Sequence, residues 1–302
     1  MLRLPLLALA AAAVAVDAAK VLIPLYKWDD QCWPELQSAA AKNPTASFIA
    51  VINPNSGPII DVNDPNLYCV PVLRQKIPNL TVLGHLRTGY GDRSASDVKA
   101  DVAMYETWAG LSVSAGGVEG TPKLDGIFFD ESPSFQDSET GLDTYKGYAT
   151  VARSALGSGA TVIFNPGTPS SSKLYAFADY VVAYESYYKN FASAKLPTDA
   201  ALQAKSAIML HDFPSDSSTL SSTVSSLAPS YGALWISDVS IDEKDIYKYW
   251  GSNWNAFVAD VAAASSTAPI EVSSTSVPTT TKSTATAPCK SHRHAQAQSP
   301  IK

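Results

Sequence analysis

Eight short apolar runs recur along this chain, and they constrain its fold more than any other feature. Each run is rich in β-branched or aromatic side chains, and its hydrophobicity is continuous rather than alternating. Strands of this kind are buried on both faces, as in a parallel sheet covered by helices. The runs occupy residues 21–26, 48–53, 81–86, 126–130, 161–165, 180–185, 207–211 and 233–237.

The segments between these runs have the periodicity of amphipathic helices. The clearest spans residues 94–109, where Ser94 and Asp97 form a capping signature. A second ends the apolar part of the chain, and we interpret its aromatic side chains as packing residues rather than ligand contacts. The predicted inward faces of the two helices are Val98, Val102, Tyr105 and Ala109, and Trp254, Phe257, Val258 and Val261.

Eight strands, each followed by a helix, predict an α/β fold in which one (β/α)₈ TIM barrel forms a single domain over residues 19–264. An open, doubly wound sheet would show the same alternation. Neither a GxGxxG motif nor a P-loop follows any of the strands, which disfavours a nucleotide-binding version of that alternative.

The two ends of the chain differ from the barrel segment. Residues 1–18 predict a signal peptide, with Arg3 ahead of an apolar stretch and small residues at the expected cleavage site. An uncleaved anchor is the alternative, although the stretch falls short of the roughly 20 residues that span a bilayer. Residues 265–302 are rich in Ser, Thr, Pro and Ala and predict a disordered tail. We therefore expect a secreted, extracellular protein.

The net charge of the chain limits the classes of partner that it can bind. A net charge of -6 and a pI near 5.2 argue against nucleic acid and against acidic membrane surfaces, and favour a neutral or cationic substrate. No segment after the signal peptide is predicted to span a membrane, and we expect a monomer. Asn79 begins a glycosylation sequon.

Three cysteines, Cys32, Cys69 and Cys289, leave at least one thiol unpaired. Cys32 follows the first strand and Cys69 lies in the second helical segment, so a bridge between them is compatible with export but is not determined by the sequence. Their spacing does not indicate a metal site.

The sharpest candidate for chemistry is the apolar strand 126–129, which ends at Asp130 and Glu131. Catalytic residues of TIM barrels lie where strands end and βα loops begin. Adjacent side chains point to opposite faces of a strand, so only one acid faces the barrel axis unless the backbone turns there. The alternative is structural: Asp130 caps a helix or pairs with Arg87 or Arg93.

Glu185 ends another apolar strand and is the second candidate. Two strands apart, it would lie ~10 Å from the fourth strand by backbone spacing, and inward-leaning side chains bring such acids into the range of glycosidase carboxylate pairs. One acid would be protonated and the other ionised. An ion pair with a neighbouring Arg or Lys is the alternative.

Polar and aromatic residues at the other strand ends are candidates for substrate binding, although each could equally be a packing or structural residue. No cofactor and no metal are predicted, because no third ligand accompanies His211 and Asp212. The chain also lacks a GxSxG elbow and a phosphate-binding glycine loop. The substrate-binding candidates are Tyr26, Trp28, Asn53, His85, Arg87, Tyr90, Arg93, Asn165, Tyr188 and His211.

Several of these segments together resemble the spherulin-4, or spherulation-specific, family. The resemblance follows the family order over nearly all of residues 20–262. The matching segments are 22–26, 52–58, 83–93, 126–131, 165–168 and 184–185.

The resemblance implies a (β/α)₈ barrel and, as in characterised fungal relatives, an endo-acting, retaining glycoside hydrolase that cuts α-1,4-linked N-acetylgalactosamine in galactosaminogalactan. The family's acidic cluster falls on Asp130, Glu131 and Glu185. We assign Asp130 as nucleophile or charge stabiliser, Glu185 as general acid/base and Glu131 as a supporting residue. The alternative function is a non-catalytic glycan-binding protein of the cell wall or spore coat on the same barrel.

Overall fold

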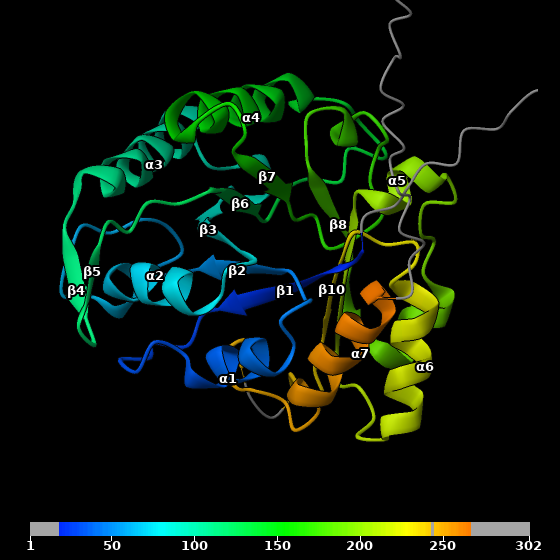
Figure 1. The fold of residues 1–302 in the computed structure, drawn as a ribbon. Coiled ribbons are helices and arrows are strands. Elements are labelled where there is room, and N and C mark those ends of the chain that lie inside the picture. The colour runs from blue at the N-terminus through cyan, green and yellow to red at the C-terminus, as the bar shows by residue number, and fades with distance from the viewer. Residues whose placement is uncertain (1–17, 243–244, 267–302) are drawn as a thin grey trace, which may run out of the picture. The chain divides into compact units, whose positions relative to one another are not determined.

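Eight parallel strands form a closed barrel in the computed structural model, which describes residues 18–242 and 245–266 (Figure 1). The order around the barrel is β1-β10-β9-β8-β7-β6-β3-β2. All eight strands match the apolar runs to within two residues at either end, so the predicted TIM barrel is confirmed. The strands are β1 (Lys20–Leu25), β2 (Phe48–Ile52), β3 (Leu80–Arg87), β6 (Gly126–Asp130), β7 (Thr161–Phe164), β8 (Tyr180–Tyr187), β9 (Ser206–His211) and β10 (Ala233–Ile236).

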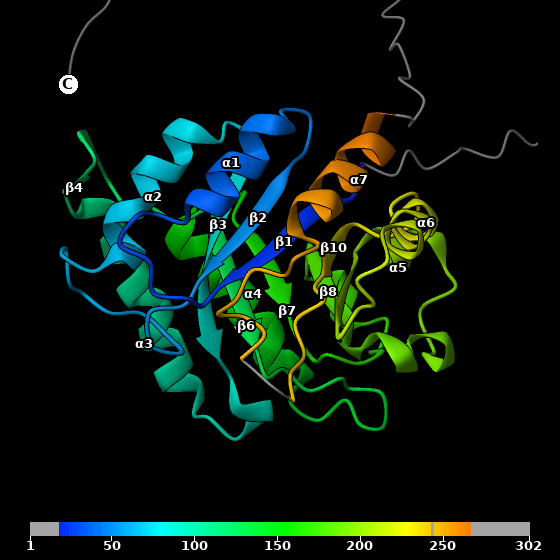
Figure 2. The same ribbon diagram turned by 90° about the horizontal axis from the view of Figure 1, so that it is seen from below.

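Helices cover the outside of the barrel, with α3 beside α4 and α6 beside α7 (Figures 1 and 2). The prediction of a helix after every strand is wrong between β7 and β8, where the described chain has only the 3₁₀ turn η3 (Leu174–Ala176). The α-helices are α1 (Pro34–Lys42), α2 (Pro65–Lys76), α3 (Ala95–Thr107), α4 (Leu142–Leu156), α5 (Ala200–Ala204), α6 (Ser217–Leu227) and α7 (Trp254–Ser266).

The strands separate two apolar cores. One fills the barrel and the other lies between the strands and the helices. Because successive side chains alternate across a strand, the same strand contributes to both. Residues of the inner core include Leu22, Leu83, Phe128, Ile163 and Met209.

Helix α3 shows where the sequence pattern misplaced one residue. The Ser94 hydroxyl accepts a hydrogen bond from the Asp97 amide at 3.2 Å, which confirms the cap. Ala109, however, is exposed, and Trp108 is buried instead. The reason is that the helix ends at Thr107 in the tighter turn η2 (Trp108–Gly110), which rotates the following side chains. The inward residues predicted for α7 are all buried.

A small hairpin and one disulfide complete the described structure. Strands β4 (Val113–Ala115) and β5 (Val118–Gly120) pair beside the barrel and were not predicted. Among the described residues, no helix has the length and hydropathy needed to cross a bilayer. The predicted signal peptide, apart from Ala18, and the tail, apart from residues 265–266, lie outside the described residues.

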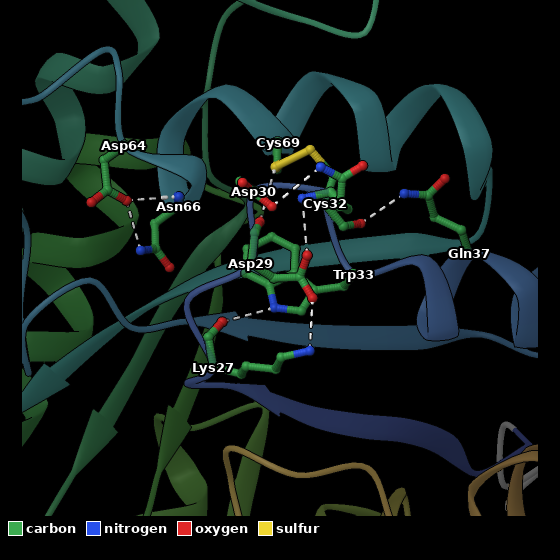
Figure 3. Close-up of a disulfide and its surroundings, with 10 residues drawn as sticks. Lys27, Asp29, Asp30, Cys32, Trp33, Gln37, Asp64, Asn66 and Cys69 are labelled. Carbon is green, nitrogen blue, oxygen red and sulfur yellow. Dashed lines mark hydrogen bonds and ion pairs between the residues drawn. A yellow bond between two sulfur atoms is a disulfide. The ribbon is translucent and has the colours of Figure 1, made fainter.

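The disulfide joins Cys32 to Cys69, with a Cα–Cα distance of 5.1 Å (Figure 3). It connects the loop after β1 to helix α2, and so resolves the pairing that the sequence left open. The loop is also held by an ion pair of Lys27 with Asp29 at 3.0 Å and by the Trp33 indole, which donates to the Lys27 carbonyl at 3.0 Å.

Candidate active site at the barrel mouth

Three polar side chains continue the rows of inner-core residues at the carboxyl ends of the strands. His85 comes two residues after Leu83, and Asp130 comes two residues after Phe128. Asn165 follows Ile163 in the same way. Since side chains two apart share one face of a strand, these residues point into the mouth of the barrel.

Glu185 reaches the same mouth through an irregularity in β8. Glu185 comes three positions after Val182, so in a regular strand the two side chains would point to opposite faces. A register shift against β9 between Val182 and Tyr184 changes this: Val182 pairs with Ala207 and Glu185 with Met209. Such a bulge re-aims a side chain, and here it directs Glu185 inward.

Three polar groups converge on the Asp130 carboxylate. The Glu131 amide and the Asn165 side-chain amide each donate to Oδ1 at 2.8 Å. The Nε2 atom of His85 lies 2.9 Å from Oδ2, and this imidazole is buried. Both oxygens of the Asp130 carboxyl group therefore have a polar partner. The predicted alternative, a pair with Arg87 or Arg93, is not formed.

Glu185 has a different set of partners. Its Oε2 atom accepts from Asn165 Nδ2 at 2.6 Å, and its Oε1 atom accepts from the Tyr247 hydroxyl. Burial raises the pKa of Glu185 above its usual 4.5, and the nearby Asp130 charge acts in the same direction, against the hydrogen bonds from Tyr247 and Asn165. Among the described residues it has no guanidinium or ammonium partner.

Asn165 links the two acids. Its Nδ2 atom donates to both, so the two acceptor oxygens lie within the sum of the two distances, about 5.4 Å, of each other. The Gly167 amide donates to Asn165 Oδ1 at 2.9 Å and so fixes which end of the amide faces the acids. Gly167 has a φ of 66°, a conformation that favours glycine. One amide thus sets the spacing of the pair.

The backbone turns at Glu131, as the placement of both acids at the mouth requires. Its φ is 52°, an uncommon value for a residue with a side chain. The buried Thr88 hydroxyl lies 3.0 and 2.7 Å from the carbonyls of Asp130 and Glu131, and it accepts from Tyr145 at 2.7 Å. Burial raises the pKa of Tyr145 to about 12, so this phenol remains a donor.

Some predicted binding residues lie beside these acids. Arg87 Nε is 3.7 Å from Glu131 Oε2, and the Tyr90 amide donates to the Glu131 carbonyl at 2.6 Å, with the Tyr90 ring exposed. The Tyr26 ring contacts His85 edge-on, with 5.2 Å between ring centroids. These three side chains border the candidate site.

Other predicted residues have partners elsewhere. Arg93 pairs with Asp101 at 2.6 Å, and Asn53 accepts from the Ser56 amide at 2.7 Å. Tyr188 packs with the outer core, where its ring lies 4.3 Å from that of Phe213. Trp28 is exposed on the loop held by the disulfide.

His211 bonds Asp212 through Nδ1 at 2.6 Å. Burial acts to raise the pKa of Asp212, but hydrogen bonds from Ser240, His211 and the Ile241 amide outweigh it and lower that pKa. Across the described residues, no group of three or more His, Cys, Asp or Glu side chains is arranged to hold a metal ion.

The sequence did not predict the contact of Tyr247 with Glu185 or the supporting role of the Thr88 hydroxyl. Tyr247 lies between β10 and α7, in a segment without strand or helix periodicity, so its contact with Glu185 had no signal in the sequence. Thr88 directly follows a predicted strand, but nothing in the sequence indicated that its hydroxyl supports the backbone of both acids.

Comparison with known proteins decides the family. The model of spherulation-specific family 4 matches residues 20–261, which is most of the chain. The chain belongs to spherulation-specific family 4. The resemblance carried by segments such as 83–93 and 126–131 is therefore confirmed.

Two relatives of this family-4 chain are informative. Spherulin-4 of Physarum polycephalum is 28% identical over 183 residues, a match that covers 61% of this chain and 49% of Spherulin-4, so the match extends over about half of that relative. The crystal structure of Aspergillus clavatus Sph3 in complex with GalNAc is similar with a TM-score of 0.70 and 27% identity. It covers 83% of this chain and 100% of Sph3.

Proposed function

We propose that this protein is a secreted glycoside hydrolase that cleaves an amino-sugar-containing wall or biofilm polysaccharide, such as the α-1,4-linked N-acetylgalactosamine of galactosaminogalactan. The observation that carries the proposal is the pair Asp130 and Glu185 held by one amide. Binding of GalNAc by Sph3 supports the choice of sugar.

The environments of the two acids support different roles. Asp130 accepts three hydrogen bonds and attacks the anomeric carbon or stabilises its positive charge. Glu185, whose pKa is raised by burial, protonates the leaving oxygen and then activates water. Glu131 borders the cleavage point as a supporting residue. The separation of about 5.4 Å or less between the bridged oxygens supports retention, because inverting pairs are about 6.5 to 9.5 Å apart.

The test is release of reducing ends from galactosaminogalactan by the wild-type protein and by Asp130→Asn and Glu185→Gln variants. Each variant should lose about 10² to 10⁴-fold in kcat, the range typical of acid–base groups. Glu139→Gln is the matched control, since Glu139 follows the same strand as Asp130 but is exposed and paired with Lys173 at 2.7 Å. Unchanged rates in both site variants would contradict the proposal.

A second candidate function is a glycan-binding protein of the wall or spore coat without catalysis. The same assay separates the two. A wild-type protein that binds the polymer in affinity electrophoresis but releases no reducing ends is the binding protein.

Secretion is supported by the signal-like residues 1–18 and by the Cys32–Cys69 disulfide, since such bonds persist in oxidising compartments. Asn79, the sequon residue, is exposed and so accessible to glycosylation. Mass spectrometry of protein from the culture medium should find an N-terminus near residue 19. Retention of residues 1–18 on intact intracellular protein would contradict secretion.

A further inference from the structure

Tyr247 reaches Glu185 from a distant part of the chain. It lies on the loop between β10 and α7, whereas Glu185 lies near the end of β8, and β9 separates these two strands in the barrel. Its hydroxyl nevertheless donates to Glu185 Oε1. A contact across an intervening strand needs a side chain that is held firmly.

The ring of Tyr247 is held by other aromatic rings. Its centroid lies 5.1 Å from that of Tyr26 and 5.4 Å from that of Trp235. It also lines a cavity of about 20 Å³ with Trp33 and Trp250, which is room for about one water molecule. The ring therefore has little space to turn away from Glu185.

The hydroxyl of Tyr247 differs chemically from the other partner of Glu185. Burial raises the pKa of Tyr247 well above its usual value, so the phenol stays protonated beside the carboxylate. A hydroxyl can donate or accept, but the Asn165 amide nitrogen can only donate. Glu185 can thus gain or lose a proton at Oε1 while both of its oxygens keep a partner.

We propose that Tyr247 is a positioning residue that orients Glu185 and sets how readily this carboxyl group exchanges its proton. The inference rests on the proposed function of Glu185 as acid/base. It assigns the exchanging proton to Oε1, the oxygen that faces Tyr247.

Other groups also shift the pKa of Glu185, so they must stay unchanged when the Tyr247 hydroxyl is removed. The Asp130 charge on β6 raises the pKa of Glu185, and His211 on β9 lowers it. Burial, and then the charges of Asp130 and Glu185, raise the pKa of Tyr26 after β1. The same causes, together with the charge of Glu131, raise the pKa of Tyr90 after β3. With these groups unchanged, removal of the Tyr247 hydroxyl should raise the pKa of Glu185, since the lost bond favours the ionised form.

The experiment compares Tyr247→Phe with Tyr184→Phe in the full chain. Phe keeps the ring between Tyr26 and Trp235. Tyr184 is the matched control, because it precedes Glu185 on the same strand but packs in the outer core and donates to the Tyr187 carbonyl at 3.0 Å. Carboxyl ¹³C NMR would follow the titration of Glu185, with Glu185→Gln to assign its resonance.

The midpoint for Glu185 should rise by about one pH unit or more in Tyr247→Phe, as expected for loss of a hydrogen bond to a charged group, and stay in place in Tyr184→Phe. The alkaline limb of kcat/KM should move by the same amount. An unchanged midpoint in a folded Tyr247→Phe protein would overturn the inference.

A second measurement needs no variant to fold. In the wild-type protein, the ring Cζ resonance of Tyr247 should titrate with the midpoint of Glu185, and independent titration would again overturn the inference. Neither NMR titration requires substrate. Failure of the hydrolase function and failure of the role of Tyr247 are therefore separate results.

Discussion

The two halves of the barrel mouth are built differently. On the side of β6, β7 and β8, polar groups are paired: Asp130, Asn165 and Glu185 form one hydrogen-bonded set. On the opposite side, the loops after β10, β1, β2 and β3 carry every exposed large hydrophobic residue found in the described part of the chain. These four strands are neighbours in the barrel. The exposed residues are Trp28, Ile60, Val62, Tyr90, Ile241 and Tyr249.

This contrast separates chemistry from binding. Single exposed apolar residues are ordinary. Because these six lie on the loops of four adjacent strands, we propose that this half of the mouth contacts the polymer. Aromatic rings suit the apolar faces of sugars. We therefore expect changes in the paired half to alter kcat and changes in the exposed half to alter KM.

Apart from the two acids themselves, the residue of the paired half whose loss should have the largest effect is Asn165, tested as Asn165→Ala. This change removes the donor shared by Asp130 and Glu185, and we expect kcat to fall about 10² to 10³-fold, as for other preorganised donors. Steady-state kinetics on the polymer would measure it. Asn66→Ala is the control, because Asn66 is also buried but bonds Asp64 at the start of α2. Equal loss in both variants would mean that Asn165 acts only on folding.

The paired half was partly predictable from the sequence. Continuous apolar runs located the strands, and TIM-barrel geometry placed Asp130 and Asn165 at the mouth, because both end regular rows of inward residues. Glu185 also lies at the mouth, yet strand alternation alone cannot predict the direction of its side chain, since this depends on the register shift after Val182.

Contacts that join distant segments could not be predicted from the sequence. Whether Tyr247 touches Glu185 depends on the path of an irregular loop, and irregular backbone leaves no periodicity to read. The pairing of Cys32 with Cys69 was open for a related reason: it requires two Cα atoms to lie within bonding reach, which spacing along the chain does not determine.

A second test breaks the disulfide that supports the exposed half. Replacing Cys32 and Cys69 together by Ser should lower the free energy of unfolding by about 4 kcal/mol, from the entropy of the 37-residue separation that the bond closes. Urea denaturation would measure this loss. We expect kcat to be largely retained, because the bond does not touch the acids. Cys289→Ser controls for loss of a thiol, and a matching fall in kcat for the double variant would contradict the division of the mouth.

A third test uses pH to examine the paired half. Because the folded state raises the pKa of Glu185, this group favours folding below its usual pKa and loses that contribution as pH rises through the raised value. Glu185→Gln should therefore raise Tm relative to the wild type above this window, on the order of a few degrees, and have little effect below it. Thermal unfolding across pH would check the sign. A lower Tm for the variant at neutral pH would show that the bonds to Tyr247 and Asn165 outweigh the burial of the charge.

The smallest effect should come from Trp28 in the exposed half. Its side chain is 61% exposed, while its loop is held by the disulfide and by the pair of Lys27 with Asp29. Trp28→Ala should therefore leave stability nearly unchanged and raise KM for the polymer by about three- to tenfold, the worth of one aromatic contact, with kcat unaltered. Ile60→Ala is the control, since it removes exposed apolar surface without an aromatic ring. An equal change for both variants would mean that general apolar contact, rather than stacking on Trp28, holds the polysaccharide. No change for either variant would leave the exposed half without a role in binding this polymer.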